Sequence, residues 1–318
     1  MGSDSVLKLP SIDFSGLGDS EPGSHGWNSV QNAVRGALEE YGCFEALYDK
    51  VTVELHDEVF NEMEEMYNLP AETKRRFVDP TKLYDGYLAD LPLYPLSEAM
   101  GMHDALNSGA IERLADLLWP EGNTKFCELL NTYLRRLSEL DYMIQKMVFR
   151  SFGVEHYLDS HAESTKHSLR LLRYGAPKTE EAQAGGITHY DTSFVTMLQQ
   201  NHVNGLEVQT KHGDWIKVAP SASSTIVMIG ESFHGWSNGR LHCPRHRVMM
   251  SGHEARHSIG IFSCVEGTII QCPNELVDEQ HPLLFKPFDT DGLIRIFATP
   301  EGQNGGASAL KTFYSAIN

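Results

Sequence analysis

Between residues 165 and 265 the chain divides into short apolar runs separated by turn residues. The runs are SLRLLRY, THYDTSFVTMLQQ, GLEVQT, WIKVAP, STIVMIG, HRVMM and SIGIFSCV. Turn-forming sequences such as Gly-Ala-Pro, Asn-Gly, His-Gly-Asp and Ser-Asn-Gly lie between them. Strand-length runs at this regular spacing predict a β-barrel or a double-sheet jelly roll.

The segments on either side of this β region have a helical pattern. Apolar side chains recur at helical spacing in 27–40, 51–66 and 123–152, and Asn123 follows a Pro-Glu-Gly turn, where it can cap the third helix. Residues 278–318 combine prolines with loop-like sequence and one further helix. The predicted fold is therefore mostly β with flanking α.

We divide the chain into three segments of one catalytic unit. Residues 1–165 form an N-terminal helical region, and 166–275 form the jelly-roll core. Residues 276–318 form a C-terminal extension that lines the active site. The segment 84–94 (YDGYLADLPLY) is a second candidate for lining the mouth of the site.

Charge and cysteine content restrict the classes of partner. The 26 basic and 43 acidic residues give a formal net charge of −17, which argues against nucleic acids and anionic membranes. The one compact basic run, residues 74–76, is interpreted as a solvated helix face. Five widely spaced cysteines without a CxxC motif favour reduced thiols and a cytoplasmic protein. No obligate protein partner is evident.

The sequence ITHYDTSF contains a candidate pair of metal ligands. In an extended strand His189 and Asp191 share a face, because side chains alternate, but H-x-D also occurs by chance. His246 begins a later apolar run and can supply a third ligand. Two histidines and a carboxylate form the facial triad of non-haem Fe(II) oxygenases. The alternative, a zinc knuckle of His242, Cys243 and His246, lacks a second ligand pair nearby.

A second pair of residues suits an organic anion. Arg256 and Ser258 alternate on a predicted strand and therefore share a face. A guanidinium fork next to a hydroxyl fits one terminal carboxylate. A buried arginine in an apolar run needs an anionic partner, and a structural salt bridge is the competing explanation.

Together these features resemble the plant-type 2-oxoglutarate/Fe(II)-dependent dioxygenases over nearly the whole chain. The segments LPSIDF, NLPAETKRRF, LWPEGN, GLEVQTKHGDWIKV and SNGRLH are similar to that family in its usual order. Within that family, the sequence is most similar to the AOP-like enzymes of specialised metabolism. The resemblance implies a double-stranded β-helix (jelly-roll, cupin-like) core with N-terminal and C-terminal helices.

The resemblance also implies roles for individual residues. His189, Asp191 and His246 correspond to the iron ligands. Arg256, Ser258 and Tyr174 correspond to the residues that bind the distal carboxylate of 2-oxoglutarate. Phe262 and Arg170 are at positions that often face the substrate. Leu172 departs from the family, which often has Asn there, so one polar contact to the co-substrate is absent or replaced.

The activity implied is oxidation of a small specialised metabolite, such as an alkaloid, glucosinolate, steroidal compound or hormone. The enzyme would hydroxylate, desaturate or dealkylate it with Fe(II), 2-oxoglutarate, O2 and ascorbate as reductant, and release succinate and CO2. Because Asp191 is present, halogenation is not expected. Two alternatives stay open: an Fe(II) oxidase of the same fold that does not consume 2-oxoglutarate, and a catalytically silent small-molecule binding protein.

Overall fold

The computed structural model describes residues 7–17, 22–78, 83–177, 181–219, 221–300 and 307–316. Its α-helices are α1 (His25–Glu40), α2 (Val53–Asn68), α3 (Ala71–Lys74), α4 (Ala110–Leu118), α5 (Thr124–Ser151), α6 (Leu158–Ser164), α7 (Glu231–Trp236), α8 (Thr290–Phe297) and α10 (Ala309–Phe313). Within these residues, no helix is both long and apolar enough to cross a membrane.

Eight strands form the larger of two sheets. Their spatial order is β1 (Ser11–Asp13), β2 (Cys43–Leu47), β10 (Ser224–Ile229), β7 (Val195–Gln200), β12 (Arg256–Val265), β5 (Thr165–Tyr174), β4 (Ser97–Met102) and β3 (Gly86–Leu88). All pairs are antiparallel except β1 with β2. The longest ladder joins β12 to β5 over ten residue pairs.

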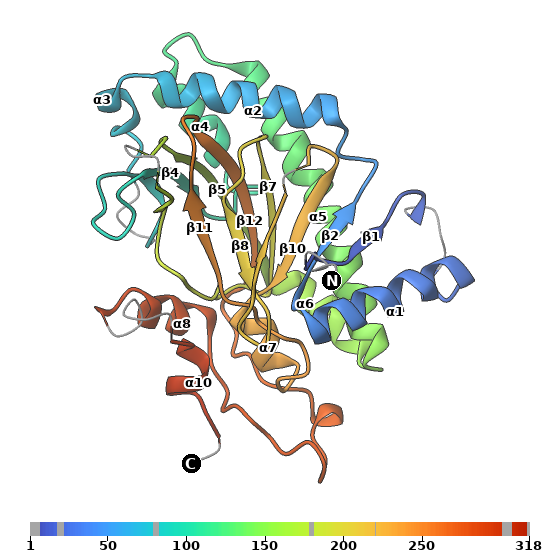
Figure 1. Cartoon of the computed structure of the whole chain (residues 1–318). Helices are drawn as coiled ribbons and strands as arrows, with labels where there is room; N and C mark the ends of the chain where they lie inside the picture. The colour runs from blue at the N-terminus through green and yellow to red at the C-terminus, as the bar shows by residue number, and fades with distance from the viewer. Residues whose placement is uncertain are drawn as a thin grey trace, which may run out of the picture.

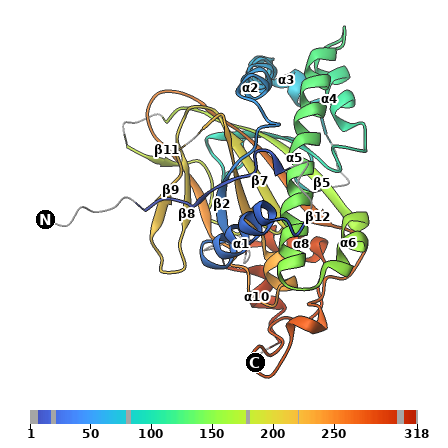
Figure 2. The ribbon, with the colours of Figure 1, turned by 90° about the vertical axis from the view of Figure 1, so that its right-hand side faces the viewer.

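Four strands form the smaller sheet. Their order is β6 (Gln183–Ala184), β11 (His246–Met250), β8 (Leu206–Gln209) and β9 (Trp215–Lys217). Figure 2 shows this sheet on one side of the molecule and α4, α5 and α6 on the opposite side. The two sheets form the predicted jelly roll, and all seven runs identified from 168 to 265 contain strands.

Helix α5 supports the outer face of the larger sheet. It packs against β7 and β12, and its apolar side buries Leu130, Leu137 and Ile144. Asn123 caps it as predicted, because its side-chain oxygen accepts a hydrogen bond from the Phe126 amide at 2.9 Å. In Figure 1, α2 lies at one end of the sheets while α8 and α10 lie at the other.

The alternation of β12 separates the packed core from the site. Ile259 and Ile261 belong to the main hydrophobic core, and burying each contributes about 1.5–3 kcal/mol. Arg256, Ser258 and Gly260 alternate with them and therefore face the space between the two sheets. One face of β12 therefore packs in the hydrophobic core, and the other face is directed toward the site.

Two features of the N-terminal half differ from the sequence prediction. The region expected to be helical also contributes β1, β2, β3 and β4 to the larger sheet. The basic run is not uniformly solvated: Lys74 is 4% exposed, whereas Arg75 and Arg76 are exposed. Its ammonium group donates hydrogen bonds to the Glu98 carboxylate and the Tyr67 carbonyl, both at 2.8 Å, which offsets its burial.

Candidate metal and co-substrate site

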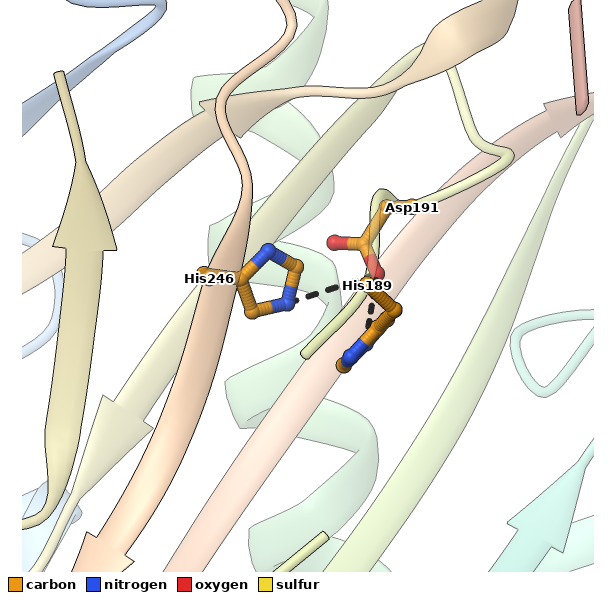
Figure 3. Close-up of side chains that lie close together, drawn as sticks. All are labelled: His189, Asp191 and His246. Atoms are coloured by element: carbon orange, nitrogen blue, oxygen red, sulfur yellow. Dashed lines mark ion pairs between the residues drawn. The ribbon is translucent and has the colours of Figure 1, made fainter. Parts of the chain in front are cut away.

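The three predicted metal ligands meet between the two sheets. His246 is the first residue of β11, and His189 forms an isolated bridge to it through reciprocal backbone hydrogen bonds of 3.1 and 3.0 Å. With Asp191, one potential ligand atom from each residue lies within 4.8 Å of the others. Figure 3 shows the three side chains directed toward one another.

The segment that carries His189 and Asp191 is not a ladder strand, contrary to the simplest interpretation of its alternation. It connects β6 to β7, and its one β contact is the bridge to His246. Asp191 is instead fixed by hydrogen bonds: the Thr196 hydroxyl donates to its Oδ2 at 2.6 Å, and the Glu231 amide donates to its carbonyl at 2.7 Å. The bridge at His189 and the hydrogen bonds at Asp191 therefore fix this irregular segment at both ligand positions.

The donor atoms have the chemistry that ferrous iron requires. His189 Nδ1 is 3.0 Å from the Ile187 carbonyl, so it carries the proton and Nε2 presents a lone pair. Nε2 of His189 and Nε2 of His246 lie 3.5 and 3.7 Å from the same oxygen, Oδ1 of Asp191. Two imidazole nitrogens and a carboxylate oxygen converging on one point fit Fe(II).

The electrostatics favour the metal-binding forms of Asp191 and His246, whereas the Asp191 carboxylate raises the pKa of His189 despite its burial. Burial raises the pKa of Asp191, but the charge of His246 and the hydrogen bond with His189 outweigh it, so this pKa lies well below its usual range. Burial lowers the pKa of His246 to about 4. At neutral pH, Asp191 is therefore ionised and His246 is neutral, as metal ligation requires.

A buried arginine lies in the same space without an acidic partner. Arg256 is 0% exposed, and its Nε and Nη2 donate to Oε1 of Gln200 at 3.0 and 2.6 Å. Its Nη1 donates to the Ser258 hydroxyl at 3.2 Å. No carboxylate of the described residues pairs with this guanidinium, which excludes the structural salt bridge within that part of the chain.

Tyr174 completes this group of polar side chains. It is opposite Arg256 in the β12–β5 ladder, and the guanidinium carbon lies 5.0 Å from the centre of its ring. Burial raises the pKa of Tyr174, and hydrogen bonds with Arg256 and Ser258 only partly oppose the rise. The phenol therefore stays protonated and can donate to an anion. Leu172 occupies the next position on this face, opposite Ser258.

The triad and Tyr174 line one cavity of about 240 Å³, and Arg256 is paired with Tyr174 at its edge. This volume is many times the roughly 15 Å³ needed for a water molecule. The predicted substrate positions Arg170 and Phe262 also line it. Apolar side chains from 83–94, including Tyr84 and Tyr94, and from α8 form much of the remaining wall. Residues of both 83–94 and α8 therefore line the cavity that contains the triad.

The alternative zinc knuckle is not formed. The triad is the one group of potential metal-binding side chains found in the described part of the chain, and neither His242 nor Cys243 belongs to it. Burial raises the pKa of the Cys243 thiol well above its usual value, which disfavours the thiolate that zinc binds. His246 therefore acts with the earlier pair.

Sequence reasoning missed two polar residues of the site. Thr196 orients Asp191, and Gln200 accepts two hydrogen bonds from Arg256. Both lie on β7 and are nearly fully buried, at 1% and 3% exposure. Their polar character within a buried strand was the available signal, because such groups need partners.

Comparison with known proteins agrees with this geometry. The 2OG-Fe(II) oxygenase superfamily matches residues 166–265, and the N-terminal family of non-haem dioxygenases in morphine synthesis matches residues 9–92. The chain is 43% identical over 303 residues to a probable 2-oxoglutarate-dependent dioxygenase, AOP1, of Arabidopsis thaliana. That alignment covers 93% of this chain and 99% of the relative.

Solved structures share the fold. The dioxygenase for auxin oxidation from rice has a TM-score of 0.82 and 28% identity, covering 97% of this chain and 100% of that one. JOX2, crystallised with 2OG, Fe and JA, has a TM-score of 0.80 and 24% identity, covering 99% of this chain and 92% of that one. The chain belongs to the 2OG-Fe(II) oxygenase superfamily and is a 2-oxoglutarate-dependent dioxygenase.

Proposed function

We propose that this dioxygenase oxidises a small, largely apolar specialised metabolite and converts 2-oxoglutarate to succinate and CO2. His189, Asp191 and His246 hold the iron, while Arg256, Ser258 and Tyr174 bind the distal carboxylate of 2-oxoglutarate. The observation that carries the proposal is Arg256, which is fully buried, has no acidic partner among the described residues and is paired with Tyr174, a residue that lines the same cavity as the triad.

Each group has a task that its surroundings explain. Bound iron with 2-oxoglutarate and O2 would supply the oxidising power to break a C–H bond. The Arg256 guanidinium provides charge-assisted hydrogen bonds, and Gln200 fixes its orientation. Thr196 holds Asp191 so that Oδ1 stays directed toward both imidazoles. Leu172 next to this site offers no polar contact, so Tyr174 and Ser258 carry the remaining hydrogen bonds.

The cavity wall supports a small organic substrate. Leucines 83, 88 and 91, Tyr94 and Phe297 present apolar surface to the same space as the metal ligands. Similar proteins that are named for auxin oxidation or solved with JA handle small organic molecules. Alkaloids, glucosinolates, steroidal compounds and hormones are the substrate classes to test, and hydroxylation, desaturation and dealkylation are the possible outcomes.

The two alternatives explain the site less well. An oxidase that does not use 2-oxoglutarate leaves the Arg256 charge buried without an anion, at a cost of several kcal/mol. A silent binding protein does not require Thr196 and Ile187 to orient two metal-binding side chains. Succinate formed in proportion to product would distinguish the proposed dioxygenase from the oxidase. Binding of Fe(II) would distinguish it from the silent binding protein.

Incubation with plant extract tests the widest range of candidate substrates. The enzyme is incubated with extract, Fe(II), 2-oxoglutarate and ascorbate, and the metabolites are compared by mass spectrometry with a parallel Asp191→Ala reaction. We expect one metabolite to gain an oxygen atom, lose two hydrogens or lose an alkyl group, with one succinate formed per product. Product without matching succinate would favour the oxidase.

The state of the thiols supports a cytoplasmic setting. All five cysteines are free, and three are buried. Thiols in this state fit the reducing cytoplasm, where we place the enzyme. Ascorbate is the proposed reductant that keeps iron in the ferrous state.

A further inference from the structure

A second arginine lies on the inner face of the β5 strand. Arg170 and Tyr174 share this face, four residues apart, which corresponds to about 13 Å along an extended strand. Tyr174 is opposite Arg256, so the two arginines lie at different levels along β5, and Arg170 and Tyr174 line the same cavity. The level of Arg256 is assigned to the co-substrate, and that of Arg170 has no assigned ligand.

The neighbouring strands leave room for the Arg170 side chain. Its partner in β12 is Gly260, and its partner in β4 is Gly101. A Cβ atom at position 101 would lie 2.0 Å from the Tyr84 carbonyl oxygen and 2.9 Å from Nη1 of Arg170. Glycine at this position therefore lets the guanidinium and the 84–94 segment approach the strand.

The guanidinium is held in place but has no counter-ion in contact. Nη1 of Arg170 donates to the Tyr84 carbonyl at 2.5 Å, and the guanidinium carbon lies 5.3 and 5.9 Å from the ring centres of Tyr84 and Phe262. Asp85 is the acidic residue with the largest influence on it. No carboxylate oxygen of the described residues lies within 4.0 Å, so the charge is not neutralised by an ion pair there.

A fixed cation in an apolar cavity selects for an anion. Arginine stays protonated at every physiological pH, and its planar edge matches two oxygens of a carboxylate. The net charge of −17 disfavours acids at long range, so recognition of an acid requires a local positive group. The surrounding leucine, phenylalanine and tyrosine side chains suit the apolar body of the same molecule.

We propose that Arg170 binds a carboxylate of the substrate, so that this dioxygenase acts on apolar organic acids. The inference rests on the proposed function, because it places the acid in the cavity beside the iron and 2-oxoglutarate. Tyr84 positions the guanidinium through its carbonyl, and the Phe262 ring lies 5.9 Å from the guanidinium carbon. The carboxylate orients the apolar part of the acid toward the metal ligands.

The test uses phenylalkanoic acids with two to five methylenes and their primary amides. Each pair has nearly the same shape but differs in charge. Binding is measured by calorimetry under nitrogen with the protein saturated with Fe(II) and 2-oxoglutarate. The visible band of the Fe(II)–2-oxoglutarate complex is recorded for every variant, because it reports the co-substrate site separately.

We expect at least one acid to bind about tenfold or more tightly than its amide, the effect of a charged hydrogen-bonded pair. Arg170→Gln should reduce this preference below about threefold, and Arg170→Lys should retain part of it. Arg173→Gln is the matched control: it lies on the same strand, but its partner is Glu98 at 2.8 Å, and it should keep the full preference.

Equal binding of acids and amides, binding of neither, or a preference that survives in Arg170→Gln would overturn the inference while the band stays intact. Absence of the band in the wild-type protein would instead refute the proposed function, and the inference with it. A purely structural role for Arg170 predicts lower thermal stability of Arg170→Gln without any change in the preference for acids.

Discussion

Replacing Arg256 tests the co-substrate site most quantitatively. Its guanidinium is fully buried and bonded to neutral groups, among them Gln200 and Ser258, in the described structure. A carboxylate bound there would accept two charge-assisted hydrogen bonds, each contributing about 1.5–3 kcal/mol. Arg256→Met should therefore weaken 2-oxoglutarate binding by roughly 3–6 kcal/mol, or on the order of 100- to 20,000-fold. Arg256→Lys keeps a charge but loses the two-pronged guanidinium, and we expect it to bind 2-oxoglutarate about tenfold more weakly.

The stability of the free protein should respond in a different way. Breaking a buried ion pair costs about 3–5 kcal/mol, but Arg256 has no such pair to break within the described residues. Its removal relieves an unfavourable buried charge and loses three hydrogen bonds, so the two effects oppose each other. We expect the free energy of unfolding without 2-oxoglutarate to change by less than about 2 kcal/mol.

Calorimetric titration of 2-oxoglutarate into the Mn(II)-substituted protein measures the affinity without turnover. Thermal unfolding with and without 2-oxoglutarate measures stability, since ligand at 100 times Kd stabilises by about 2.7 kcal/mol. Arg173→Met is the control, because Arg173 is next to Tyr174 but pairs with Glu98. An affinity for Arg256→Met within threefold of wild type would refute the assignment.

Three further substitutions test the metal site and the cavity. His189→Ala should abolish Mn(II) binding measured by calorimetry, while His242→Ala, a half-buried histidine outside the ligand cluster, should bind normally; equal binding by both would mean that the ligands are misassigned. Thr196→Val removes the 2.6 Å hydrogen bond to the ligand carboxylate and should weaken Mn(II) binding about 10- to 100-fold, whereas unchanged affinity would show that this bond has no orienting role. Gly101→Ala puts a Cβ 2.0 Å from a backbone oxygen and should destabilise the fold by about 1–3 kcal/mol in chemical denaturation. Gly175→Ala, whose nearest atom is 3.7 Å away, should be nearly neutral, and similar losses for both would argue against the steric explanation.

Local periodicity was sufficient to predict the long helices α1, α2 and α5 and seven of the strands, β5 and β7 to β12. Runs such as STIVMIG and SIGIFSCV are strands because β-branched and apolar residues dominate them and turn residues bound them. Strands β3 and β4 were missed because Gly86 and Gly101 and several polar residues interrupt their apolar pattern. Their pairing with β5 supplies what the local sequence lacks.

The candidate site could be predicted from residue types, but its support could not. The His-x-Asp pair and His246 had the right chemistry, yet their meeting depends on a single bridge between distant segments. The polar side chain of Thr196 in an apolar strand was a signal, but its role could not be predicted, because that role depends on the turn that brings it to Asp191. Lys74 was misjudged for the same reason: Glu98, its partner, is distant in sequence and adjacent only in the fold.

We propose that one site binds both iron and 2-oxoglutarate, through His189, Asp191 and His246 for the metal and Arg256, Ser258 and Tyr174 for the co-substrate. Absorption spectroscopy of the Fe(II)-loaded protein, titrated with 2-oxoglutarate under nitrogen, measures both events at once. We expect a weak visible charge-transfer band that saturates with 2-oxoglutarate and is absent in Asp191→Ala. A wild-type protein that binds Fe(II) but develops no band at saturating 2-oxoglutarate would contradict this proposal.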